Sequence, residues 1–190
     1  MKLTVRPLSP RTWPDLEAVF NARGCSVARG CWCMYYRESG AQAVPEGERL
    51  RDVRRRRLAA LAAEEAPVGL VGYRGKEPVG WVSFAPHEDY VKLARSPVLR
   101  PVDGQPVWSI VCFVVPAQFR SQGVARQLLA AVVAFARRRK IVLEAYPVDR
   151  AGRSGDDTMW FGAKSMFDAA GFREVARRKP ERPIVRLHPA

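Results

Sequence analysis

Two periods of apolar residues run through the first half of the chain, and each predicts a kind of element. Apolar residues three and four apart, such as Leu16, Val19 and Phe20, predict helices. Short apolar runs predict strands, and two of them flank a turn at residues 74–78. In chain order the predicted elements are a strand over residues 3–7, helices over residues 10–22 and 45–65, and hairpin strands over residues 68–73 and 79–84. Residues 23–45 show neither period and are expected to be irregular.

The second half of the chain alternates apolar strands with amphipathic helices. Its first apolar run ends at Pro116, and the helix that follows carries Leu128 and Val132 in its apolar stripe. The predicted elements are a strand over residues 107–115, a helix over 122–139, a strand over 141–146, a helix over 158–170, and strands over 172–177 and 184–187. This alternation indicates an α/β protein whose sheet is covered on both faces. No repeat or linker divides the chain, so we expect one domain over residues 1–190.

The chain is strongly basic, with a formal net charge of +13 and a pI of about 10.3. This charge favours anionic partners, namely nucleic acid, an anionic membrane surface or a phosphate-bearing cofactor. Much of it lies in two runs, residues 54–57 and 137–140, inside predicted helices, which favours a solvated basic face. The sequence lacks helix-turn-helix, zinc-finger and RNP-type signatures, so a nucleic-acid-binding module is the less favoured interpretation.

Apolar runs and cysteine usage predict a location in the cytoplasm. No apolar run approaches the ~20 residues that span a bilayer, and the N-terminus has no apolar signal core, so no membrane partner is expected. The cysteines, expected to stay reduced, are Cys25, Cys31, Cys33 and Cys112. Their spacing does not match the paired cysteines of structural zinc sites, and the chain has 2 histidines, so no metal site is predicted.

One segment combines a strand, a turn and a helix start. The apolar run Ile110–Val115 is followed by Pro116 and then by residues 120–125, which fit the pattern R-x-x-G-x-A. A glycine in the turn lets the backbone approach a ligand closely. The first N–H groups of a helix and its positive dipole end bind anions. The pattern therefore predicts a phosphate site at Ser121–Arg126.

This segment and its surroundings resemble the GNAT acetyltransferases, in which a strand and an R/Q-x-x-G-x-G/A turn bind acetyl-CoA. The resemblance implies the GNAT fold, a mixed and mostly antiparallel sheet of about seven strands flanked by helices. It also implies that β-strand backbone at Val114 and Val115 bonds the pantetheine, and that Arg120–Ala125 wrap the pyrophosphate. The residues expected to bind acetyl-CoA are Phe113, Val114, Val115, Arg120, Ser121, Gln122, Gly123, Val124, Ala125, Arg126 and Phe167.

The last predicted helix departs from the family pattern N-x-x-A-x-x-x-Y-x-x-x-G-F. Aligned on Gly171-Phe172, the sequence has Trp160 in place of the Asn and Phe167 in place of the Tyr that commonly protonates the departing thiolate. Phenylalanine has no proton to give. The thiolate is then protonated either from solvent or by another group, for which Tyr146 and Cys112 are the candidates.

A base is also expected, because attack on the thioester needs a neutral amine. The first candidate is Glu144, which interrupts an apolar strand where burial raises the pKa of a carboxyl group. The alternative for Glu144 is a structural ion pair with an arginine. The second candidate is the cluster at residues 87–89, on the long connection over residues 85–106.

In the GNAT plan the acceptor enters between the loop joining the first two helices and the loop after the third strand, here residues 23–44 and 85–106. The first loop holds a dense aromatic run, which would stack on a substrate or pack as a core plug. Arg54 and Arg57 lie in the apolar stripe of the second helix and either snorkel or face the site. The candidate acceptor-binding residues are Trp32, Tyr35, Tyr36, Trp81, His87 and Tyr90.

The favoured function is acetyl transfer from acetyl-CoA to a primary amine of a small molecule, by direct attack in a ternary complex. The acceptor classes considered are an amino acid, a polyamine and an aminoglycoside-like antibiotic. The alternatives are a protein or peptide acetyltransferase, a GNAT domain that binds acetyl-CoA without turnover, and the nucleic-acid-binding module. A homodimer is kept as an open alternative to a monomer.

Overall fold

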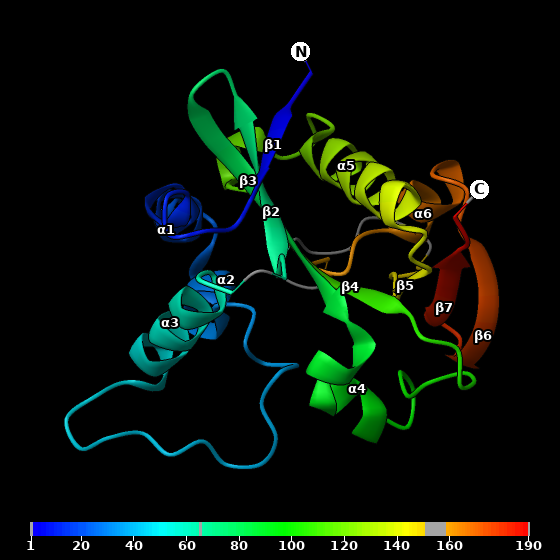
Figure 1. Ribbon diagram of the computed structural model, residues 1–190, viewed down its shortest axis with the longest axis horizontal. Helices are drawn as coiled ribbons and strands as arrows, with labels where there is room; N and C mark the ends of the chain where they lie inside the picture. The colour runs from blue at the N-terminus through cyan, green and yellow to red at the C-terminus, as the bar shows by residue number, and fades with distance from the viewer. Residues whose placement is uncertain (1, 65, 151–158, 190) are drawn as a thin grey trace.

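The computed structural model describes residues 2–64, 66–150 and 159–189, which form one twisted sheet with helices on both sides (Figure 1). The 7 strands follow the order β1-β2-β3-β4-β5-β7-β6, and every pair is antiparallel except β4 with β5. The strands are β1 (Thr4–Pro7), β2 (Gly69–Arg74), β3 (Glu77–Pro86), β4 (Trp108–Val114), β5 (Leu143–Ala145), β6 (Arg173–Lys179) and β7 (Arg182–Leu187). The predicted mixed, mostly antiparallel sheet is confirmed.

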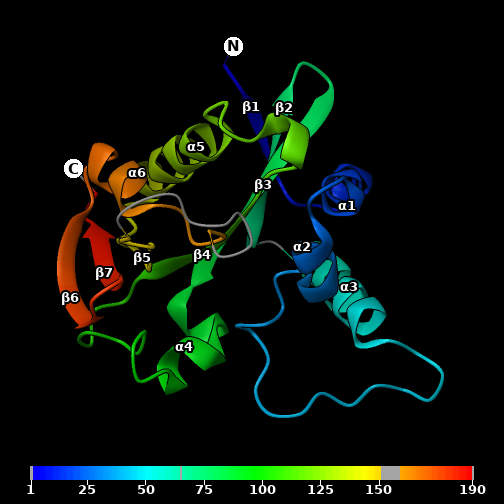
Figure 2. The same ribbon diagram turned by 180° about the vertical axis from the view of Figure 1, so that it is seen from behind.

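The helices lie in two groups on opposite faces of the sheet (Figures 1 and 2). One face carries α1 (Trp13–Asn21), α2 (Ser26–Cys31) and α3 (Leu50–Leu61), and the other carries α5 (Val124–Arg139) and α6 (Lys164–Ala169). Three short helical segments complete the set: the 3-10 helices η1 (His87–Asp89) and η2 (Ala117–Phe119), and the α-helix α4 (Val91–Arg95). Among the described residues, no helix is long and apolar enough to cross a membrane.

Alternation along the central strands supplies the apolar surface for both layers. Leu70 and Val82 point into the cluster that packs on α5, whereas Val71 and Trp81 point into the cluster formed with α1 and α3. Successive side chains of a strand point to opposite faces, so both faces of an apolar strand are buried when helices cover both. The central position of the sheet therefore follows from the near-continuous apolar runs in its strands.

Several predicted elements differ from the structure. The long connection over residues 85–106 contains η1 and α4, and helix α3 ends at Leu61 rather than near residue 65. The irregular segment 23–45 contains the short helix α2, whose sequence carries no 3.6-residue apolar stripe of useful length. Helix α3 begins at Leu50 rather than near residue 45, after Gly47, which has a φ of 76°. Helix α6 begins at Lys164, so of the helix predicted over 158–170 the first part is a turn, and residue 158 lies outside the described residues.

Strands β4 and β5 pair over only three residues and then diverge, which opens the sheet. Pairing runs from Trp108 with Leu143 to Ile110 with Ala145. Beyond this point β4 bulges at Val111, which has no partner in the register with β3. Residues 159–163 lie beside the free part of β4. The open edge at this split positions the site described below.

Gly69 is a residue of β2 that tolerates no side chain, and Gly69→Ala is expected to destabilise the fold. A Cβ there would lie 2.2 Å from Trp81 Cη2 and 2.4 Å from the carbonyl oxygen of Val82, which is backbone of a buried strand. Overpacking of this kind costs about 1–3 kcal/mol or more. Gly30→Ala is the control, because a Cβ there meets nothing within 4 Å and Ala favours a helix. Equal thermal unfolding midpoints for the two variants would contradict this packing.

Candidate functional site

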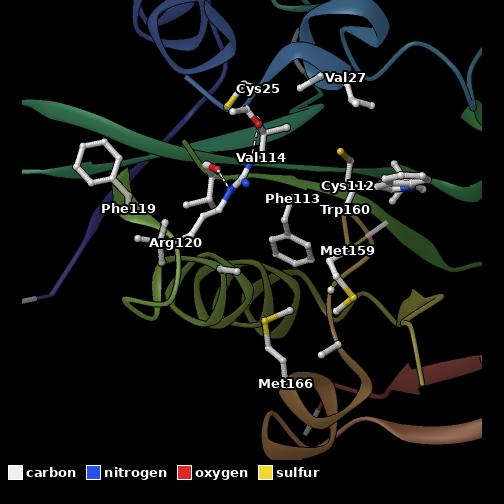
Figure 3. A pocket seen from close by; sticks show the side chains of 18 of the residues that line it. Cys25, Val27, Cys112, Phe113, Val114, Phe119, Arg120, Met159, Trp160 and Met166 are labelled. Carbon is white, nitrogen blue, oxygen red and sulfur yellow. Dashed lines mark hydrogen bonds between the residues drawn. The ribbon is translucent and has the colours of Figure 1, made fainter. Parts of the chain in front are cut away.

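A cavity of about 810 Å³ lies at the split between β4 and β5 (Figure 3). Four segments form its wall: residues 24–36, residues 111–115 at the end of β4, residues 119–126 leading into α5, and residues 159–166. Most of the lining side chains are apolar, and the volume lies within the range of ligand pockets, about 300–1,000 Å³. Figure 3 shows Phe113, Met159 and Met166 on the side of α5 and α6, and Cys25 and Val27 on the opposite side.

One end of the cavity is the start of helix α5. Ser121 and Gly123 both have left-handed backbone, with φ of 57° and 76°. Gly123 is the N-cap and no side chain caps the helix. The first N–H groups of a helix, here those of Val124–Arg126, have no partner within the helix. With the positive dipole end and the nearby Arg126, these groups form a cradle for an anionic group such as a phosphate.

Arg120 braces this end of the cavity. Its Nε donates to the carbonyl oxygen of Val115 at 3.0 Å, and its Nη2 donates to that of Gly24 at 2.5 Å. The guanidinium thereby joins the end of β4 to the loop before α2, as the dashed lines in Figure 3 show. Gln122 lies outside the lining, because its amide bonds Arg74 and the carbonyl oxygen of Gln118 instead.

The wall formed by β4 is partly occupied by the chain itself. The N–H of Phe113 donates to the carbonyl oxygen of Trp160 at 2.7 Å. The Phe113 ring meets that of Phe167 edge-on at 6.2 Å between centroids. Phe167 is fully buried and lies outside the cavity lining. Between this contact and the start of α5, the cavity wall consists of Val114, the last residue of β4, and Val115.

All 4 cysteines of the chain line this cavity, with free thiols. Cys33 and Cys112 are in side-chain contact, and Trp81 Nε1 donates to Cys33 Sγ at 3.3 Å. Burial raises the pKa of Cys31 to about 11 and raises that of Cys25. The predicted thiol Cys112 therefore lies with the three cysteines of residues 25–33, which the sequence did not place in the same site.

Aromatic rings form the end of the cavity away from α5. Tyr35 and Tyr36 meet edge-on at 5.0 Å, and Tyr36 packs on Phe161 at 5.5 Å. Lys92 Nζ lies 3.6 Å from the centre of the Tyr35 ring, a cation–π contact. Burial raises the pKa of Tyr36 to about 12. Of the six predicted acceptor-binding residues, these two tyrosines line the cavity.

The other four lie behind its wall. Trp32 is buried and stacks on Phe20 at 4.8 Å, on the α1 side. Trp81 is buried and reaches the cavity only through its bond to Cys33. The remaining two pack deeper: Tyr90 bonds Ser83 at 3.2 Å, and His87 Nδ1 lies 2.9 Å from Ser109 Oγ.

Glu144 and Tyr146 form a buried polar network away from the cavity lining. Glu144 accepts from Arg186 Nε at 2.7 Å and from the Tyr146 hydroxyl at 2.8 Å, and its side chain has no exposed surface. Tyr146 also bonds Ser109 at 2.8 Å and lies 3.1 Å from His87 Nδ1. Burial raises the pKa of Tyr146 and lowers that of His87, which keeps both groups neutral. This is the arginine-paired arrangement that the sequence left as the alternative for Glu144.

The two basic runs also have local partners. Arg54 and Arg57 hold the buried carboxylate of Glu38 at 2.8 Å and 3.1 Å. They therefore brace the loop before α3 rather than line the cavity. The run at residues 137–140 ends α5, where cations suit the negative end of the helix dipole. Among the described residues, no group of three His, Cys, Asp or Glu side chains is placed to hold a metal ion.

Sequence patterns missed half of the cavity wall. The missed residues are Gly24, Cys25, Val27, Ala28, Cys31, Cys33, Val111, Phe119, Met159, Trp160, Gly162, Ala163, Ser165 and Met166. For the cysteines a signal existed, since three of them cluster in one irregular segment. For residues 159–166 none did, because their place beside β4 depends on the split of the sheet.

The uncapped start of α5 offers donors for an anion, and it opens into an apolar cavity that could take a long, mostly apolar chain. The sequence model of the acetyltransferase (GNAT) family matches residues 32–151 of the chain. That range covers more than half of the chain, and the protein therefore belongs to the GNAT family of acetyltransferases, enzymes that transfer an acetyl group from acetyl-CoA to an amine.

Solved structures share the fold at low sequence identity. A histone acetyltransferase HPA2 and related acetyltransferase from Corynebacterium glutamicum has a TM-score of 0.59 and 16% identity, over 100% of this chain and 98% of its own. A ribosomal-protein-alanine N-acetyltransferase from Brucella melitensis has a TM-score of 0.55 and 20% sequence identity, over 97% of this chain and 99% of its own. PaiA N-acetyltransferase from Thermoplasma acidophilum, in complex with coenzyme A, has a TM-score of 0.54 and 12% sequence identity, over 99% of this chain and 99% of its own. No curated protein sequence matches the chain.

Proposed function

We propose that this protein transfers the acetyl group of acetyl-CoA to the primary amine of a small molecule with an apolar body, by direct attack in a ternary complex. One observation carries the proposal: a single cavity connects the uncapped start of α5 with an end walled by Tyr35, Tyr36 and Trp160. The first end suits a diphosphate, and the second suits a flat apolar group.

The residues present fit the coenzyme. The N–H groups of Val124–Arg126 would hold the pyrophosphate, where left-handed Gly123 keeps the approach free of a Cβ. Val114 and Val115 offer the strand backbone that would bond the pantetheine amides. When bound, the coenzyme supplies an activated acetyl thioester. Phe167 and Gln122 support this end from outside the cavity, through the Phe113 ring and through Arg74.

The other end selects the acceptor. Among the described residues, none of those lining the cavity has a carboxylate, and the nearby carboxylates of Glu38 and Asp89 are already bound by arginines. A polyamine or an aminoglycoside carries several positive charges and would meet Lys92 at this end without a counter-charge. An amine with an aromatic or aliphatic body matches the tyrosines and Trp160 better.

A panel of amines tests this proposal. Purified protein with acetyl-CoA would be offered 2-phenylethylamine, phenylalanine, spermidine, kanamycin and a peptide with a free N-terminus, and released thiol would be followed with a chromogenic disulfide. We expect turnover of the aromatic monoamine to exceed that of spermidine and kanamycin. Preference for the peptide would favour the protein-acetylating alternative. Binding of acetyl-CoA without turnover of any amine would favour a domain that only binds the coenzyme.

A further inference from the structure

Cys33 and Cys112 come from distant parts of the chain and meet at the cavity wall. Cys33 lies in the loop after α2, and Cys112 lies on β4, next to the bulge at Val111. Their thiols are in hydrogen-bonding contact, and both residues line the cavity. The indole N–H of Trp81 donates to Cys33 Sγ at 3.3 Å, so Cys33 sulfur accepts hydrogen bonds from both neighbours.

The backbone holds Cys33 in an uncommon conformation. Trp32 and Cys33 are consecutive residues with left-handed φ values of 48° and 52°. Residues with a Cβ adopt this region rarely, and such positions concentrate at functional sites when the surrounding structure enforces them. Here the Trp32 ring is locked by stacking on Phe20 at 4.8 Å and on Trp13 at 5.8 Å. The packing therefore directs the Cys33 thiol toward Cys112.

No conventional acid or base competes with these thiols. In the described part of the chain, no Asp, Glu or His lines the cavity. Glu144 is enclosed with Arg186, and His87 lies behind the wall with Ser109. Apart from the arginines, which stay charged, the ionisable side chains that line the cavity are those of the four cysteines and of Tyr35 and Tyr36.

We propose that Cys33 and Cys112 are the paired base and acid of acetyl transfer, an inference that rests on the proposed function. The Cys33 thiolate takes the proton from the amine nitrogen as the new C–N bond forms at the acetyl carbon. The Cys112 thiol gives its proton to the coenzyme sulfur as the C–S bond breaks. Proton transfer from Cys33 to Cys112 across their contact then restores both groups, so that one proton passes from the amine to the released thiol.

Electrostatics supports this division of roles. The hydrogen bond from Cys112, together with that from Trp81 and the charge of Arg37, lowers the pKa of Cys33 despite its burial. The same contact and burial raise the pKa of Cys112 well above the usual value. The geometry supports the same division, because the Trp81 N–H that donates to Cys33 Sγ at 3.3 Å favours the thiolate on Cys33. A thiolate suffices as the base, because an amine nitrogen becomes far more acidic once it is bonded to the acetyl carbon.

The other titratable groups around the pair stay neutral near pH 8. Burial raises the pKa of Tyr90, whose ring lies under the guanidinium of Arg37, to about 12. Burial likewise raises the pKa of Cys31 to about 11 and that of Tyr36 to about 12. Arg37, in turn, is ion-paired with Asp89 at 3.0 Å. We therefore expect kcat to rise with pH as Cys33 ionises and to fall only where Cys112 loses its proton.

Kinetics on single variants tests the pair. With the panel amine that is turned over fastest, Cys33→Ser and Cys112→Ser should each lower kcat by about 100-fold or more, the range of acid–base catalysis. The Kd for acetyl-CoA should stay near the wild-type value, which also shows that the variants fold. Cys33→Ser should in addition lose the rise of kcat with pH. Arg177→Met is the control, because Arg177 lies on β6 outside the cavity lining, and it should keep the wild-type rate.

Alkylation by iodoacetamide supplies a readout that needs no acceptor. Peptide mass spectrometry should show Cys33 labelled faster than Cys31 and Cys25, at a rate that rises as the Cys33 thiol ionises, and acetyl-CoA should protect it. Wild-type turnover by both serine variants, or a Cys33 no more reactive than Cys31, would overturn the pair. If no panel amine is acetylated, the proposed function fails, and the labelling pattern still decides whether Cys33 is the reactive thiol.

Discussion

Gly123→Glu should abolish measurable binding of acetyl-CoA. The substitution places a carboxylate at the helix start where the pyrophosphate is expected, and Gly123 has a left-handed φ of 76°. Two like charges about 4 Å apart at a protein surface repel by about 4 kcal/mol, which corresponds to a loss of about three orders of magnitude in affinity. Calorimetric titration with acetyl-CoA measures this loss directly.

Gly47→Glu is the matched control for this variant. Gly47 has the same φ of 76°, is exposed, and like Gly123 offers open space to a Cβ. The control therefore carries the same backbone strain and the same added charge away from the cavity. It should bind acetyl-CoA as the wild type does. Equal affinity of the two variants would show that the start of α5 does not hold the coenzyme.

Arg186→Met should destabilise the protein by about 3–5 kcal/mol, the usual effect of leaving one partner of a buried ion pair uncompensated. Its guanidinium is the cation bonded to Glu144, at 2.7 Å, and the two side chains are 4% and 0% exposed. Without Arg186, the buried carboxylate of Glu144 keeps the hydrogen bond from the Tyr146 hydroxyl but loses its cationic partner. Chemical denaturation with urea measures the free energy of unfolding.

The double variant Glu144→Gln, Arg186→Met should recover part of this loss, because the uncompensated charge is removed. Arg177→Met is a surface control, since its ion pairs with Glu174 and Asp149 are partly exposed, and it should change stability little. If Arg186→Met unfolded at the same urea concentration as the wild type, the network would have no structural role, and Glu144 would again be open to a catalytic one.

The sequence predicted the architecture well, for a physical reason. Strands β2, β3 and β4 are buried on both faces, so their apolar runs are nearly continuous and distinct from the 3.6-residue stripe of α5. Errors fell where elements are short or begin without a cap signal. Helix α2 has 6 residues, and α6 begins at Lys164 after a turn that only tertiary contacts define.

The candidate site divides in the same way. The cradle at residues 121–126 is local, because a glycine and a helix start lie next to each other in sequence. Contacts between distant segments leave no such local pattern in the sequence. Glu144 interrupts an apolar strand, but its partner Arg186 comes from β7, and no local pattern indicates that pairing. The contact between Cys33 and Cys112 is equally non-local and was missed although both thiols were noted.

The most direct test of the central claim is a calorimetric titration of the folded wild-type protein with acetyl-CoA. The account predicts saturable binding of one molecule per chain, competed by free coenzyme A. A protein that unfolds cooperatively on heating, and is thus folded at the start, yet shows no binding would contradict it, because the cradle at the start of α5 and the cavity beside β4 would then serve another ligand.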